Sequence, residues 1–72
     1  MTKFTWGDYV RVKEDAPKPC RPGAFATVVG VAESPIGYPD RYTIEFGDGT
    51  DVEVTDEQLE MIEPAGADED DR

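Results

Sequence analysis

The chain has 72 residues, with seven lysines and arginines against seventeen aspartates and glutamates, for a net charge of −10 at pH 7. A domain of about 60 residues buries only about 60% of the surface of its unfolded chain, which leaves little room for the internal cavity that most small-molecule enzymes need. One cysteine excludes an intramolecular disulfide, and the lack of histidine excludes a zinc site of the usual Cys/His type. We expect a single non-enzymatic domain, without catalytic residues, metal or cofactor.

The negative charge is concentrated in the second half of the chain. Residues 1–43 carry six basic and five acidic side chains, whereas residues 44–72 carry one basic and twelve acidic ones. Affinity for nucleic acid comes chiefly from Lys and Arg contacts to phosphate, so this net charge disfavours a nucleic-acid partner. Charged residues follow Met1 almost at once, so we expect no signal peptide, no membrane span and a cytoplasmic protein.

The first strand is predicted over residues 4–13. Val10 and Val12 alternate with polar side chains, which is the period of a half-buried strand. The lead-in carries Trp6, which we expect to cover one end of the fold, because so large a ring is rarely left in water in a small domain.

Residues 14–23 form a predicted loop that three prolines make stiff, since each proline fixes one φ angle. The basic side chains of Lys18 and Arg21 lie in it, and Cys20 between them is interpreted as an incidental loop residue. The second strand is predicted over residues 25–32, with a bulge or sharp bend at Gly30.

A second loop, over residues 34–40, contains two more prolines and leads into the most strongly patterned part of the chain. Residues 41–46 alternate as a strand, and residues 50–54 return antiparallel with alternate valines inward. The dipeptide Asp48-Gly49 between them favours a type I′ hairpin turn.

The end of the chain is predicted to hold one helical turn and one short strand. Thr55 and Gln58 have the spacing of a capping box, and so few residues follow before Pro64 that we expect a single 3₁₀ turn feeding a strand over residues 59–62. The acidic residues that follow have nothing to bury, so residues 1–63 are predicted to form the domain and residues 64–72 a disordered tail.

Five short strands with one 3₁₀ turn before the last predict a small all-β barrel. The stretches 7–13 and 22–29 resemble the opening of SH3-like barrels of the KOW and translation-protein type, and 42–46 and 59–62 resemble the rest. The β-subunit barrel of nitrile hydratases and the small electron-transport accessory proteins share this plan. The resemblance implies an SH3-like barrel over residues 4–63.

The acidic side chains Glu45, Asp51 and Glu53 alternate with apolar residues, which places them on the solvent face of one hairpin. The simpler interpretation is a solvated face, and the alternative is an acidic surface for a basic partner. The Asp48–Asp51 stretch has too few ligands for a calcium loop of the EF-hand type.

The leading hypothesis is a monomer that binds a protein partner through the two proline-containing loops and the aromatic side chains beside them. Eight residues are candidates for that contact: Trp6, Tyr9, Arg11, Lys13, Lys18, Arg21, Tyr38 and Tyr42.

Three alternatives stay open. The four basic candidates between residues 11 and 21 suit a barrel associated with RNA, although the acidic half opposes it. The aromatic candidates suit a cage for a cationic group; in the simpler interpretation Trp6 and Tyr42 belong to the core or cover the end of the barrel, and Tyr9 and Tyr38 are partly exposed. The resemblance also allows an accessory subunit of a larger enzyme.

Overall fold

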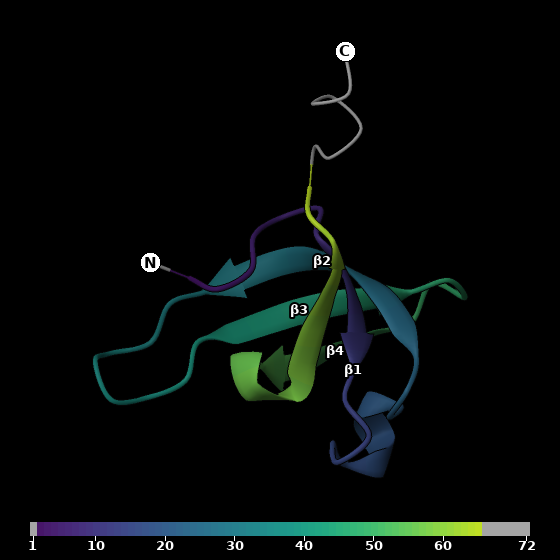
Figure 1. The fold of residues 1–72 in the computed structure, drawn as a ribbon, viewed down its shortest axis with the longest axis horizontal. Helices are drawn as coiled ribbons and strands as arrows, with labels where there is room; N and C mark the ends of the chain where they lie inside the picture. The colour runs from purple at the N-terminus through teal and green to yellow at the C-terminus, as the bar shows by residue number, and fades with distance from the viewer. Residues whose placement is uncertain (1, 66–72) are drawn as a thin grey trace.

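The computed structural model describes residues 2–65, which form one five-stranded sheet and two short 3₁₀ turns (Figure 1). The elements are β1 (Tyr9–Val12), η1 (Lys18–Cys20), β2 (Phe25–Ala32), β3 (Arg41–Phe46), β4 (Asp51–Thr55), η2 (Asp56–Gln58) and β5 (Leu59–Glu63). The strand order is β4-β3-β2-β1-β5, and every neighbouring pair is antiparallel. The predicted all-β architecture, with a 3₁₀ turn before the last strand, is confirmed.

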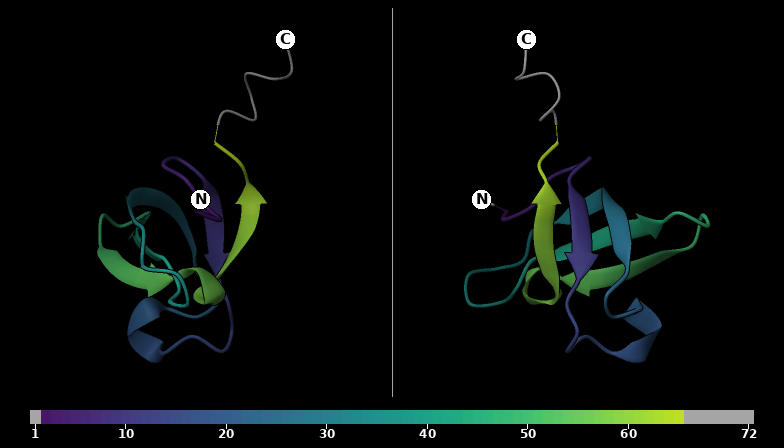
Figure 2. Two further views of the ribbon diagram at one scale, coloured as in Figure 1. Left: turned by 90° about the vertical axis from the view of Figure 1, so that its left-hand side faces the viewer. Right: turned by 45° about the vertical axis from the view of Figure 1, so that its right-hand side comes forward.

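The sheet curls so that its inner face encloses one core (Figure 2). Val10 and Val12 of β1 are fully buried, as their alternation predicted, and Ile44 and Leu59 meet them from β3 and β5. The sharp bend of β2 coincides with a register shift between Val28 and Gly30, which confirms the predicted bulge. A Cβ at Gly30 would lie 3.2 Å from the side chain of Thr43, so glycine permits the close approach of β3.

Trp6 does not cover the end of the barrel, as the sequence had led us to expect; it is 64% exposed. The Asp8 amide donates to the Thr5 carbonyl at 3.1 Å, and Gly7 has φ +90°, as in a type II turn. Trp6 occupies the outer corner of this turn, and β1 starts only at Tyr9. Because the turn breaks the strand alternation, Phe4 enters the core and Trp6 points outward.

Two buried polar side chains anchor the ends of the described chain. The Asp8 carboxylate, 2% exposed, accepts hydrogen bonds from the Thr5 amide at 2.9 Å and from the Ala65 amide at 2.7 Å. The Tyr42 hydroxyl accepts hydrogen bonds from the amides of Lys3 and Phe4 at 3.0 and 3.2 Å. Ala65, assigned from sequence to the tail, is therefore held to the domain; the rest of the predicted tail from residue 66 lies outside the described residues.

Cys20 is part of the core rather than an incidental loop residue. Its amide donates to the Pro17 carbonyl at 2.9 Å, which closes the 3₁₀ turn η1. The turn directs the Cys20 side chain inward beside Ala16, where only 9% of the residue stays exposed. Loop 14–23 thus folds over one end of the barrel and contributes to its interior.

The β3–β4 turn differs from the predicted type I′. Only Gly49 in it has positive φ, whereas type I′ requires positive φ at both central residues. The Gly49 amide donates to the Phe46 carbonyl at 3.0 Å, and the Phe46 amide donates to the Thr50 carbonyl at 2.8 Å. This is a three-residue loop with glycine at the left-handed position, and the Asp48 carboxylate accepts a hydrogen bond from the Thr50 amide at 3.0 Å.

The capping box before β5 is present as predicted. The Gln58 side-chain oxygen accepts a hydrogen bond from the Thr55 amide at 3.0 Å at the start of η2. This turn leads the chain from β4, at one edge of the sheet, to β5 at the other.

Asp48 gives a pH-dependent prediction. The hydrogen bond from the Thr50 amide, together with one from the Arg21 guanidinium at 3.1 Å, lowers the pKa of Asp48 from its ordinary 3.8. A lowered pKa means that folding favours the charged form, so this stabilisation is present above pH 3.8 and is lost as the pH falls through the folded-state pKa. We expect Asp48→Asn to lower the free energy of unfolding slightly at pH 7, because asparagine keeps an acceptor for Thr50 but loses the charge.

The measurement is urea unfolding of Asp48→Asn and the unmodified chain between pH 7 and about pH 2. The difference should shrink as the pH falls below 3.8. Asp51→Asn makes the same charge change in β4, where the carboxylate has no ion pair among the described residues, and serves as the control. A difference for Asp48→Asn that does not vary with pH would contradict this account.

Candidate functional site

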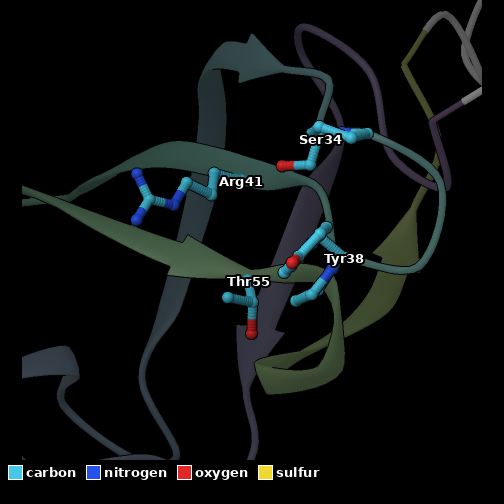
Figure 3. Close-up of a pocket in the computed structure, with 6 residues that line it drawn as sticks. Ser34, Tyr38, Arg41 and Thr55 are labelled. Atoms are coloured by element: carbon cyan, nitrogen blue, oxygen red, sulfur yellow. The ribbon is translucent and has the colours of Figure 1, made fainter.

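The loop between β2 and β3 borders a hollow of about 420 Å³ (Figure 3). The lining residues come from this loop, the start of β3 and the end of β4: Ser34, Pro35, Tyr38, Pro39, Arg41 and Thr55. The rings of two prolines and one tyrosine make most of this lining apolar. We call this region the β2–β3 hollow.

Local hydrogen bonds hold the loop in shape. The Tyr38 amide donates to the Pro35 carbonyl at 3.1 Å, and Gly37, with φ +95°, takes the third position of this type II turn. Asp40 closes the base: its carboxylate accepts a hydrogen bond from the Ser34 amide at 2.8 Å, and its carbonyl accepts one from the Asp56 amide at 3.2 Å. A loop held in this way loses little conformational entropy when it binds a partner.

The tip of the loop presents apolar side chains to water. Ile36 is fully exposed and Tyr38 is 70% exposed. At the margin of the hollow, Arg41 lies 3.7 Å from Glu53, in an exposed ion pair. The hollow therefore offers apolar contact area with charges at its edge, which is the usual anatomy of a protein-binding surface.

The two proline-containing loops do not form one surface. Loop 14–23 precedes β2 and loop 34–40 follows it, and β2 has eight residues. At about 3.3 Å per residue the two ends of such a strand lie about 23 Å apart along its path. Figures 1 and 2 show the loops at different ends of the sheet. Only loop 34–40 borders the hollow.

The basic candidates are not a free cationic stretch. Arg11 forms ion pairs with Glu14 and, at 3.0 Å, with Glu60. Arg21 pairs with Asp48 at 3.1 Å, and its guanidinium lies 4.6 Å from the centre of the Phe46 ring. Within residues 2–65, Lys13 and Lys18 alone among the four have no ion pair.

The aromatic candidates are dispersed. Tyr42 is buried and packs edge-on against Phe4 with ring centres 5.3 Å apart, which supports the core role considered for it. Tyr9 stacks on Phe25, and within the described part of the chain no two of the four candidate rings contact each other. Phe25 was not identified from the sequence as a surface aromatic residue. Neighbouring side chains of a strand point to opposite faces, so the burial of Ala26 places Phe25 on the outer face of β2.

Other kinds of site have no counterpart among the residues described. Residues 2–65 contain no group of three or more Cys, Asp or Glu side chains arranged to hold a metal ion. No helix in the same range has the length and apolar character needed to cross a membrane.

Comparison of the chain with protein-family models, with curated proteins and with solved structures finds no match.

Proposed function

We propose that the chain is a non-enzymatic module that binds a protein partner through the β2–β3 hollow. The observation that carries this proposal is the exposure of Ile36 and Tyr38 on a loop that its own hydrogen bonds hold in place. An apolar side chain of the partner would enter the hollow between Pro35, Tyr38 and Pro39. A cytoplasmic location, and a role as accessory subunit of a larger enzyme, are compatible with this function.

The charge of the chain constrains the partner further. With a net charge of −10, the protein repels acidic partners and attracts basic ones over a Debye length of about 10 Å at moderate salt. We therefore propose an occupant with an apolar side chain flanked by lysine or arginine. The RNA-associated alternative has less support, because Arg11 and Arg21 already have carboxylate partners.

The test is a selection of random dodecapeptides displayed on phage against the intact chain, followed by NMR chemical-shift mapping with the most enriched peptide. We expect enrichment of an apolar residue next to basic ones, and shift changes confined to residues 34–41 and Thr55.

Ile36→Ser removes an exposed apolar contact of the kind that is worth about 1 kcal/mol at an interface, so affinity should fall about fivefold. The same variant should keep its stability within about 0.5 kcal/mol, because Ile36 packs against nothing.

Ile62→Ser is the matched control, since Ile62 is also an exposed isoleucine but lies in β5. It should bind the selected peptide as the unmodified chain does. Shift changes confined to Glu45, Asp51 and Glu53 would contradict the proposal, and so would equal losses in the two variants.

A further inference from the structure

A row of outward-facing side chains crosses all five strands. The sheet register pairs Asp51 with Glu45, Glu45 with Thr27, Thr27 with Tyr9 and Tyr9 with Glu63. Residues directly opposite each other in a regular sheet point to the same face, so the side chains from Asp51 to Tyr9 share the outer surface. Glu63 is paired with Tyr9 across a register shift between β1 and β5, and it is exposed beside them. We call this row the outer strip.

The Tyr9 ring of the outer strip stacks on Phe25, its diagonal neighbour across β1 and β2. The ring centres are 5.8 Å apart and the planes differ by 10°. Tyr9 is 40% exposed and Phe25 is 49% exposed, so roughly half of each residue stays in water. An exposed aromatic face attracts cations through its quadrupole, and guanidinium groups most often of all.

The carboxylates of the outer strip have no counter-ion in the part of the chain that the structure describes. Within residues 2–65, Glu45, Asp51 and Glu63 form no ion pair, and Glu45 lies directly opposite Asp51, where like charges repel. Arg11 lies on the same side of β1 as Tyr9, opposite Phe25, and is already paired with two glutamates. Lys13 lies just beyond the end of β1.

The geometry points to a partner segment that bears arginine: we propose that its guanidinium groups stack on the Tyr9–Phe25 pair and pair with the carboxylates of Glu45, Asp51 and Glu63. Arginine suits both contacts, because its planar group stacks on aromatic rings and pairs with carboxylates through two parallel hydrogen bonds. Lysine offers only a point charge. This surface lies at the opposite end of the β3–β4 hairpin from the β2–β3 hollow, so it is a second interface beyond the proposed function.

The spacing of the strip defines the probe. Tyr9 and Glu45 are two strands apart, which is about 10 Å. Three residues of a polyproline II segment make one full turn and rise about 9 Å, so every third side chain returns to the same side at nearly this distance. A nonapeptide with three Gly-Ser-Arg repeats therefore brings arginines to both positions. Peptides with Gly-Ser-Lys or Gly-Ser-Glu repeats are its matched controls.

The experiment is an NMR titration of the intact chain with these peptides at low salt. We expect the arginine peptide to shift the amide signals of Tyr9, Phe25, Thr27 and Glu45, with an affinity that falls as salt is added. Phe25→Leu keeps an apolar side chain but removes the ring, so binding should weaken about threefold. Glu45→Gln should weaken it by a similar factor, whereas Glu57→Gln, the same change at an exposed residue of η2, should have no effect.

Several results would overturn the proposal. Equal binding of the lysine peptide would exclude guanidinium stacking. Equal losses of affinity in Glu45→Gln and Glu57→Gln would show that only the net charge of the chain matters for binding. Shifts of the strip signals by oligouridylate would identify a nucleic-acid surface instead. If Phe25→Leu fails to fold, Glu45→Gln still tests the proposal, because Glu45 is exposed and its substitution should leave the fold intact. Ile36→Ser should bind the arginine peptide normally, which separates this proposal from the function of the hollow.

Discussion

Tyr42→Ala should lower the free energy of unfolding by about 3–5 kcal/mol, the range found when a large buried aromatic ring is removed. The Tyr42 ring is 1% exposed, packs edge-on against Phe4, and its hydroxyl accepts two amide hydrogen bonds from the N-terminal segment. A domain of this length has a total stability of about 4–11 kcal/mol. The loss is therefore a large fraction of the total stability, and it should appear as a lower urea midpoint in a titration followed by circular dichroism.

Tyr42→Phe separates the ring from the hydroxyl. It keeps the edge-on contact with Phe4 but leaves the Lys3 and Phe4 amides without their acceptor, which should cost about 1–3 kcal/mol. The N-terminal amides should then exchange faster with solvent than those of β3. If Tyr42→Phe is as stable as the unmodified chain, the two hydrogen bonds to the hydroxyl do not contribute to stability.

Asp8→Ala should lower the free energy of unfolding by about 3 kcal/mol, because hydrogen bonds to a charged group are worth about 1.5–3 kcal/mol each. The Asp8 carboxylate is buried and holds two segments together: the turn at Thr5 and Ala65, the second residue after β5. Its removal leaves both amides without an acceptor and frees the two ends of the domain from each other.

The consequence of Asp8→Ala is best measured by urea unfolding together with hydrogen exchange at Thr5 and Ala65. Asp15→Ala, at an exposed position in loop 14–23, is the matched control and should change stability by less than about 0.5 kcal/mol. Equal effects of the two substitutions would contradict the anchoring role of Asp8. Asp8→Asn, which keeps one acceptor, should lie between alanine and the unmodified chain.

The candidate site could be predicted from sequence only in part. The prolines and Tyr38 of loop 34–40 marked it as part of a candidate partner surface, and in the structure hydrogen bonds hold this loop in shape and its tip is exposed. That loop 14–23 lies at the other end of the sheet could not be inferred, because the relative position of two loops depends on how the strand between them pairs. The partner-binding roles of the eight candidate residues stay predictions.

The outer strip shows the same limit. Glu45 and Asp51 were placed together because a single hairpin joins them, and strand alternation alone decides their face. Tyr9 and Glu63 are more than fifty residues apart in sequence, and only the pairing of β1 with β5 brings them into line. Register between distant strands depends on the packing of the whole core, which no local pattern records.

The sequence by itself determined the elements whose signals are local. β-branched residues placed β2 and alternation placed β3 over the residues that form them, and the capping box at Thr55 placed η2. Tertiary structure decided which large side chains became core. Phe4 and Cys20 are buried while Trp6 is exposed, because two tight turns redirect the chain against its own alternation. Hydrophobicity alone predicted that Trp6 would be more buried than Cys20, and this is wrong. Burial depends on contacts between segments that are distant in sequence, which hydrophobicity does not describe.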